Sequence, residues 1–283
     1  MIHKKTFINH KKILVLLSMS LLKKIRNKLS DPRLDGVDVD SPELLVVHRK
    51  IMMEKHIMRE VFTEFYQTCI NYDNTYFSGE GQRIEIGAGV SFFKELYPEI
   101  ISTDIKPADN LDRVLDALNM DLEDESVRGF YGINCFHHFP SPDKFFKELE
   151  RTLIPGGGCV LIEPYYGAVA AKMYKSLFDT ETFDPKQKEW ESDASIMYGA
   201  NQALSYIVFV RDRKLFEERY PNLEIVKVKP LSNYMRYLLS GGLNFRSLVP
   251  GVLSPLVKGV EWMLTPLHRV LGLHYAIVIR KRK

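Results

Sequence analysis

Apolar and polar positions alternate in short blocks over residues 82–163, and these blocks predict strands and helices in turn. Apolar runs suitable for buried strands occupy residues 83–86, 100–105, 113–115, 129–136 and 158–162, and the stretches between them predict helices at 91–96, around Asp109 and at 143–152. This alternation favours a doubly wound, mostly parallel sheet of the α/β class with helices on both faces. Ligands of such sheets bind at the carboxyl ends of the strands.

Helical patterns also precede this block. Residues 42–70 have the pattern of two helices, and Ser41 followed by Pro42 suits an N-cap with proline at the first helical position. We therefore expect a helical N-terminal extension over residues 31–80 and a main domain over residues 81–283.

The composition is that of a globular protein without stabilising cross-links. The chain has 283 residues, of which 45% are hydrophobic and 27% are charged, and this suits one large domain with additions or two small domains. Cys69, Cys135 and Cys159 lie far apart and form no C-x-x-C pair. The sequence thus indicates neither a disulfide framework nor a zinc site, and we expect no metal ion and a reducing, cytoplasmic compartment.

Charge is distributed unevenly along the chain, although the net charge is only +3. Residues 1–30 carry eight Lys or Arg and no acid, and residues 231–283 carry eight Lys or Arg and a single acid, Glu261. Residues 31–230 hold the remaining 23 basic and 35 acidic residues and are therefore net −12. Such separation predicts that the two basic ends meet an anionic partner.

The basic N-terminal segment, residues 1–30, contains an apolar stretch at 13–22 between two Lys-Lys pairs. The stretch has ten residues, against the ~20 that are needed to span a bilayer. A cleavable export signal would also have a basic start, but Lys23 and Lys24 follow the apolar stretch directly and no small-x-small cleavage site is visible. An amphipathic anchor at a membrane surface and a core helix with solvated ends both remain open.

Residues 231–272 form a second apolar region with single basic residues. Its short helical stretches are broken at Gly241-Gly242, Pro250, Pro255 and Pro266. They could lie on a membrane surface with Trp262 at the level of the lipid headgroups, or they could pack as a lid on the main domain. Neither interpretation makes the chain transmembrane.

A glycine turn ends the first predicted strand of the main domain. Gly87-Ala88-Gly89 lets the backbone turn sharply and lets a ligand approach the amides of the next helix. A dinucleotide site would have a third glycine where Phe92 stands, so the pattern argues against NAD.

Three acidic residues accompany this turn. Glu85 precedes Gly87 by two residues and would be costly to bury without hydrogen-bond donors. Asp104 ends the second strand, where a carboxylate can accept from ribose hydroxyls, and Asp116 follows the third strand, where it can accept from an adenine amino group. Acidic residues also end strands because they cap helices, but three at this spacing predict a nucleoside site with no provision for phosphates.

These motifs, in this order, are similar to those of the class I S-adenosylmethionine-dependent methyltransferases, in the compact seven-stranded, type 11-like branch. The motifs are E-x-G-x-G at 85–89, an acid at Asp104, D-A at 116–117, a His137-His138 pair and R-x-L-x-P-G-G at 151–157. Together they cover residues 83–163. Ser91 departs from the pattern, because many members have a third glycine at that position.

The resemblance implies S-adenosyl-L-methionine as the cofactor and a Rossmann-like seven-stranded fold. The fold would be completed by a helix at 211–220, a strand at 223–229 and an antiparallel last strand at 275–280, with 164–208 as a lid and 231–272 as a helical insertion. The residues that would bind the cofactor are Glu85, Gly87, Ala88, Gly89, Asp104, Ile105, Asp116, Ala117 and Asn134. Asn134 would lie close to the transferable methyl group.

The resemblance leaves the catalytic residues open. His137 and His138 are candidates for a general base, which is needed only when the acceptor is a poorly acidic hydroxyl. Adjacent residues of a strand face opposite ways, so we expect the two rings to point apart. We therefore assign no catalytic residue from the sequence.

The acceptor is predicted only as a class, a small molecule or a glycan. Aromatic and amide side chains in the lid segment suit a polyhydroxylated acceptor, and residues 199–226 and 237–242 resemble a bacterial subgroup associated with cell-surface polysaccharide synthesis. A lipid-linked glycan at the inner membrane face would agree with the basic ends, since anionic lipid attracts each Lys or Arg by about 1 kcal/mol.

Two other functions are compatible with the fold. A nucleic-acid methyltransferase is disfavoured because Asn134-Cys135-Phe136-His137 stands where an N-P-P-Y or D-P-P-Y motif is expected. A non-catalytic nucleoside-binding module on the same fold is the main alternative to the enzyme.

Overall fold

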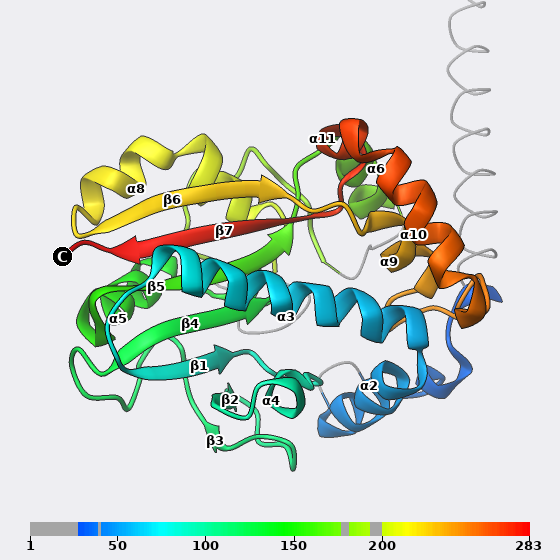
Figure 1. Ribbon diagram of the computed structural model, residues 1–283, viewed down its shortest axis with the longest axis horizontal. Coiled ribbons are helices and arrows are strands. Elements are labelled where there is room, and N and C mark those ends of the chain that lie inside the picture. Colours follow the sequence, from blue (N-terminus) through cyan, green and yellow to red (C-terminus); the bar gives the residue numbers. More distant parts are fainter. Residues whose placement is uncertain (1–27, 39–40, 177–180, 193–199) are drawn as a thin grey trace, which may run out of the picture.

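A seven-stranded sheet forms the centre of the computed structural model, which describes residues 28–38, 41–176, 181–192 and 200–283 (Figure 1). The strand order is β3-β2-β1-β4-β5-β7-β6, and β7 runs antiparallel to both of its neighbours. The strands are β1 (Gln82–Ile86), β2 (Ile100–Asp104), β3 (Arg113–Val114), β4 (Val127–Ile133), β5 (Leu153–Pro164), β6 (Leu223–Pro230) and β7 (His274–Lys281). This confirms the doubly wound, mostly parallel sheet and its antiparallel last strand.

One face of the sheet is covered by the helical segment that precedes β1. Helix α3 (His56–Tyr76) follows α2 (Pro42–Glu54), lies in front of the sheet and runs roughly along the strands (Figure 1). Its side chains Val61, Phe65 and Cys69 recur every four residues and are fully buried against Tyr131 and Val160 of the sheet. The N-terminal extension thus supplies a complete layer of the core, and its boundary at residue 80 stays a prediction.

The other face carries an aromatic core. It is formed by α5 (Pro142–Thr152), α6 (Ala168–Ser176), α7 (Leu204–Tyr206), a π-helical turn (Ile207–Arg211) and α8 (Arg213–Arg219). Phe136, Phe146, Phe209 and Phe216 lie here with ring centroids 5.0 to 5.8 Å apart. These tilted and edge-on contacts bury large apolar areas in the geometry that aromatic rings prefer.

A helical insertion lies between β6 and β7, as the resemblance implies. It contains α9 (Tyr234–Ser240), α10 (Ser254–Met263) and α11 (His268–Leu271), with short 3-10 turns at Gly251–Leu253 and Thr265–Leu267. Buried Arg236 of α9 joins three helices, because its guanidinium donates to Glu64 of α3 at 2.7 and 2.9 Å and to Glu261 of α10 at 2.6 Å. The ion pairs fix the insertion on α3.

Two local predictions are wrong. The sequence predicts a helix around Asp109, but this residue lies in a turn between β2 and β3. The connection between β1 and β2 contains only the short helix α4 (Phe93–Leu96). Strand β4 ends at Ile133 instead of Phe136, because Asn134 has φ of 52° and cannot continue a strand. The chain turns there into a 3-10 helix, Phe136–His138.

Within the described residues, no helix combines the length and the apolar character that crossing a bilayer requires. The predictions for residues 1–27 lie outside the described part of the chain.

Candidate active site

The glycine turn after β1 needs glycine for two physical reasons. Gly87 and Gly89 have φ of 65° and 45°, in the left-handed region that side chains disfavour. A Cβ atom on Gly87 would also lie 2.6 Å from the Cβ of Cys135, which follows β4. The turn is anchored by buried Ala88, whose amide donates to the carbonyl of Thr103 in β2 at 2.9 Å.

Asp104, at the end of β2, is bonded directly to this turn. Its Oδ2 accepts from the amide of Gly89 at 2.9 Å, and its Oδ1 accepts from the amide of Lys106 at 3.0 Å. Each carboxylate oxygen has a second lone pair, so Asp104 can still accept from a ligand. The next side chain, Ile105, is 63% exposed at the same strand end.

Glu85 lies within β1 and below the turn rather than at its surface. It is 3% exposed, and burial raises the pKa of its carboxyl to about 7. Ser102 donates to its Oε2 at 3.3 Å, and Ser91 also bonds to it. The hydroxyl of Ser91 is in turn 2.9 Å from that of buried Tyr66. The serine that departs from the family pattern therefore carries a buried hydrogen-bond network.

The ends of β3 and β4 complete this edge of the sheet. The Oδ1 atom of Asp116 accepts from the amide of Leu118 at 2.9 Å, and Ala117 between them is buried. The amide of Leu115 donates to the carbonyl of Asp104 at 2.9 Å, which brings the ends of β2 and β3 together. After β4, the side-chain oxygen of Asn134 is buried and has no hydrogen-bond partner among the described residues.

These positions carry the polar groups that the sequence predicts for an adenosyl ligand. The buried, unpartnered oxygen of Asn134 costs free energy unless a ligand meets it. The glycine turn leaves its backbone accessible where a Cβ atom would obstruct it, and two acids stand at consecutive strand ends. The structure brings together Gly89, Asp104 and the residues near Asp116, whereas Glu85 is turned inward.

A second cluster, the histidine–glutamate cluster, lies where β4 and β5 end and consists of His137, His138, Glu163 and Glu181. Fully buried Glu163 accepts from the amides of Cys135 at 3.0 Å and Phe136 at 2.9 Å through Oε1, and its Oε2 lies 2.7 Å from Nδ1 of His137. The other ring nitrogen of His137 is 3.3 Å from Oε2 of Glu181. His137 is therefore held between two carboxylates.

The two histidines carry different charges at neutral pH. Burial alone would lower the pKa of His137, but the charges of Glu163 and Glu181 and their hydrogen bonds raise it to about 10. Burial and the neighbouring charge of His137 lower the pKa of His138 to about 4. His137 is thus an imidazolium and His138 a neutral imidazole.

The prediction that the two histidine rings point apart is wrong. They belong to a 3-10 turn instead of a strand, their ring centroids are 4.3 Å apart, and both face Glu181. Glu181 itself was missed from the sequence. It lies 44 residues beyond His137, and no spacing signal connects the two. Gln202, 5% exposed, also bonds to Glu181, and its own Oε1 has no partner in the described chain.

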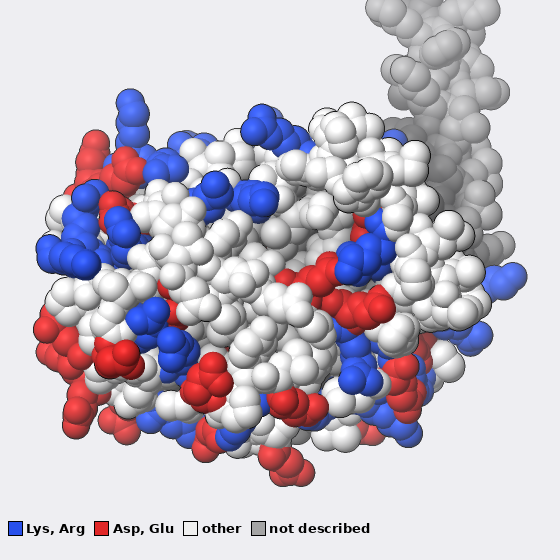
Figure 2. All heavy atoms as spheres, viewed as in Figure 1, with Lys and Arg blue, Asp and Glu red and all other residues white. Residues whose placement is uncertain are grey.

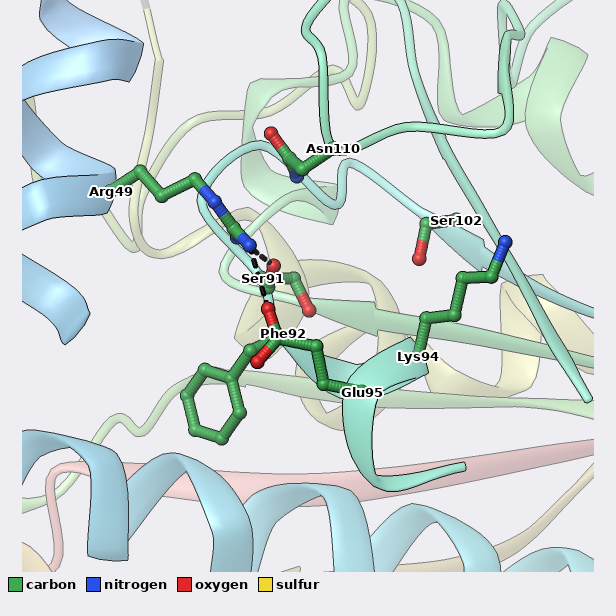
Figure 3. Close-up of a pocket in the computed structure, with 7 residues that line it drawn as sticks. All are labelled: Arg49, Ser91, Phe92, Lys94, Glu95, Ser102 and Asn110. Carbon is green, nitrogen blue, oxygen red and sulfur yellow. Dashed lines mark hydrogen bonds and ion pairs between the residues drawn. The ribbon is translucent and has the colours of Figure 1, made fainter. Parts of the chain in front are cut away.

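A cavity of about 320 Å³ lies on the outer side of the glycine turn (Figure 3). It is lined by Arg49, Ser91, Phe92, Lys94, Glu95, Ser102 and Asn110. Arg49 reaches from α2, donates to the carbonyl of Ser91 and pairs with Glu95 at 2.7 Å. Asn110 donates to the carbonyl of Gly89 at 3.1 Å. These side chains hold the turn from outside, and none of the predicted cofactor-binding residues lines this cavity.

Comparison with a protein-family model identifies the domain. Residues 85–161 match the model described as a methyltransferase domain, and this range contains the glycine turn, Asp104, Asp116 and Asn134. Residues 85–161 therefore have the sequence of a methyltransferase domain. The matched residues are those of a methyltransferase, and S-adenosylmethionine is the cofactor that the motifs imply.

One solved structure with a TM-score of 0.50 supports the fold, and a second is similar at a lower score. Geranyl diphosphate C-methyltransferase from Streptomyces coelicolor A3(2) is 14% identical, with a TM-score of 0.50, and the match covers 90% of this chain and 89% of that one. A putative sarcosine dimethylglycine methyltransferase from Galdieria sulphuraria is 16% identical, with a TM-score of 0.42, and the match covers 80% of this chain and 88% of that one. A search of curated proteins found no match. At these identities the structural likeness concerns the fold and not the acceptor.

Proposed function

We propose that this protein transfers the methyl group of S-adenosylmethionine to a small-molecule or glycan acceptor that binds beside the histidine–glutamate cluster. One observation carries the proposal. The glycine turn, Asp104, Asp116 and the unpartnered oxygen of Asn134 converge on the carboxyl edge of four strands, within a segment that matches a methyltransferase domain.

The residues of this edge have distinct binding roles in the proposal. Gly87 and Gly89 border the methionine portion, Asp104 accepts from the ribose hydroxyls, and Asp116 accepts from the adenine amino group through Oδ2. Buried Glu85 does not contact the cofactor in this proposal. Its hydrogen bonds with Ser91 and Ser102 fix the conformation of the glycine turn. The cofactor supplies an electrophilic methyl group, so the protein contributes mainly by holding the acceptor in line and excluding water.

In the proposal, the histidine–glutamate cluster positions the groups that contact the acceptor. Both ring nitrogens of His137 face carboxylates and the ring is protonated at neutral pH, so it has no lone pair to take a proton. His137 is therefore a positioning residue that holds Glu181. The carboxylate of Glu181 is the group that would accept a hydrogen bond from an acceptor hydroxyl or amine.

Aromatic side chains border the same region. Tyr166 stacks on Phe183, two residues beyond Glu181, with centroids 5.8 Å apart, and its ring centroid is 4.2 Å from that of Tyr206. Aromatic faces beside a carboxylate suit a sugar or another hydroxylated acceptor. A lipid-linked glycan of surface polysaccharide synthesis, used at the inner membrane face, is the specific form of the proposal, and the basic ends of the chain support it.

Calorimetric titration with S-adenosylmethionine tests the cofactor part. Replacing Asp104 by Asn should weaken binding roughly ten- to hundred-fold, because a charged hydrogen-bond acceptor is lost. Asp109→Asn is the matched control, since Asp109 is exposed in a nearby turn and should bind as the wild type does. Absence of binding by the wild type, or equal loss in both variants, would contradict the assignment.

Labelled methyl transfer into fractionated cell extracts tests the acceptor part. We expect label in the glycan or small-molecule pool, and Glu181→Gln should reduce it while cofactor binding is kept. Label in nucleic acid would refute the acceptor class. Cofactor binding without transfer to any pool would favour the non-catalytic module.

A further inference from the structure

The helical insertion has an unusually apolar exposed surface. Fifteen large apolar side chains are exposed in the described chain, and eight of them lie between Leu248 and Val270. We call the following set the apolar face: Val252, Leu253, Leu256, Trp262, Met263 and Leu267. Val252 is 82% exposed and Trp262 is 78% exposed. Globular proteins rarely expose so many large apolar side chains together, and such a patch is typical of an interaction surface.

The opposite side of α10 is already packed. Ser254, Val257 and Glu261 recur at helical spacing and are buried, and Glu261 is neutralised by Arg236. The apolar face is therefore the outer side of a helix that has its own internal contacts. Figure 2 shows the surface over α10 and α11 as mostly uncharged.

Residues 248–270 expose cations and no acid, while the carboxylates of Glu60 and Glu64 on neighbouring α3 are bonded to Ser254 and Lys258 of α10. Glu261 is the only acid in residues 231–283, and it is buried, so residues 248–270 expose no acid. Lys258 is 63% exposed at the edge of α10, where it pairs with Glu64, and Arg269 is exposed on α11. The cations of the insertion, above all Arg269, attract anionic lipid headgroups.

The described end of the basic N-terminal segment contacts the helical insertion. The amide of Asp31 donates to the carbonyl of Asn244 at 3.0 Å, and the amide of Arg246 donates to the carbonyl of Leu29 at 2.7 Å. Residues 29–31 thus lie against the loop that precedes the apolar face, and the sequence before them, residues 1–27, has seven Lys or Arg, no acid and the apolar stretch at 13–22.

We propose that the apolar face docks on an anionic phospholipid bilayer, with Trp262 at the headgroup level and α10 lying in the membrane plane. A short amphipathic surface with interfacial tryptophan and flanking cations binds in this way. Stable membrane attachment usually takes two signals, and in the sequence the apolar stretch at 13–22 between lysine pairs is a candidate for the second.

With α10 in the membrane plane, the region of the proposed acceptor site would lie close to the membrane. The carbonyl of Leu273, two residues beyond α11, accepts from the amide of Tyr165 at 2.8 Å and from the hydroxyl of Tyr174 at 2.6 Å. The docking surface is thus connected to the wall of the region that Glu163 and Tyr166 border. A lipid-linked acceptor could then reach the site from the membrane, and this last step rests on the proposed function.

Vesicle sedimentation of the full chain tests the proposal without added cofactor. The protein should sediment with phosphatidylcholine vesicles that contain phosphatidylglycerol, and less with pure phosphatidylcholine or at high salt. Each of the substitutions Leu256→Gln, Trp262→Gln and Met263→Gln should weaken binding to the anionic vesicles roughly ten-fold. The triple variant should therefore bind the vesicles roughly a thousand-fold more weakly than the wild type. The control Val210→Gln/Leu215→Gln changes exposed apolar side chains near α8 and should bind as the wild type does.

Fluorescence of Trp262 distinguishes the docking surface from the N-terminal segment. The only other tryptophan, Trp190, is 3% exposed, so brominated lipid should quench the Trp262 emission selectively. The proposal is overturned if the wild type ignores anionic vesicles, if the triple variant sediments equally, or if Trp262 is not quenched on bound protein. A dimer that the triple variant abolishes, without vesicle binding, would assign the face to a second copy.

The outcome is separable from that of the proposed function. The vesicles contain neither acceptor nor cofactor, so an inactive protein would still give the sedimentation result. Calorimetry with S-adenosylmethionine checks that each variant keeps its fold and its cofactor site.

Discussion

Replacing Glu163 by Gln changes the centre of the histidine–glutamate cluster while keeping its shape. Glu163 is fully buried, accepts from two backbone amides and lies 2.7 Å from Nδ1 of His137. An amide has one acceptor oxygen and an amino group that only donates. In the variant the oxygen can keep the amides of Cys135 and Phe136, but the amino group then faces another donor on His137.

The magnitude follows from the charges that remain. The variant leaves a buried imidazolium with Glu181 as its only anionic neighbour in the described chain, and breaking a buried, hydrogen-bonded ion pair costs about 3–5 kcal/mol. We expect this loss in the free energy of unfolding at neutral pH. The folded-state pKa of His137 is raised from 6.5 to about 10, so its stabilising contribution is fully present below pH 6.5 and is lost as the pH rises through about 10. The difference in the free energy of unfolding between the variant and the wild type should therefore decrease as the pH rises from 6.5 to about 10.

Urea unfolding followed by circular dichroism measures the loss, and NMR titration of labelled histidines measures the pKa. The pKa of His137 should fall in the variant. Glu218→Gln, at an exposed position of α8, is the control and should stay within about 0.5 kcal/mol of the wild type. A loss below about 1 kcal/mol, together with an unchanged pKa of His137, would refute the inferred charge pairing.

Three further variants test other parts of the structure. Gly87→Ala should cost about 1–3 kcal/mol and weaken cofactor binding in calorimetry, because its Cβ would meet Cys135, and wild-type affinity would contradict this. Arg236→Met should lower the free energy of unfolding in urea by about 3–5 kcal/mol, because buried Glu261 loses its ion-pair partner. The double variant with Glu261→Leu should recover most of this loss. An unchanged stability of Arg236→Met would show that the ion pair contributes nothing. Burial raises the folded-state pKa of Glu85 from 4.5 to about 7. The free energy of unfolding therefore has its full value, as far as Glu85 is concerned, below pH 4.5, and it decreases as the pH rises through 7. Glu85→Gln should therefore gain stability over the wild type across that window, and parallel pH profiles of unfolding would argue otherwise.

Local sequence signals were sufficient for the sheet and for most of the cofactor edge. Apolar runs bounded by turn residues located β1 to β5 to within about five residues, and the family resemblance located β6 and β7. Gly87 and Gly89 have the positive φ that only a glycine adopts without strain. Such signals work because they depend on neighbours in the chain. They failed where a residue departed from its local pattern, as at Asn134, which ends β4 in the left-handed region.

The sequence alone, then, determined the order of strands and helices, the glycine turn and the acids at the strand ends. Only the tertiary structure decided that Glu85 is buried beneath the turn, that Glu181 faces His137 from 44 residues away, and that residues 29–31 lie against the apolar insertion. The physical reason is that burial, ion pairing and exposure depend on which distant segments meet. Leu256 and Val257 are both apolar neighbours on α10, yet folding exposes the first and buries the second.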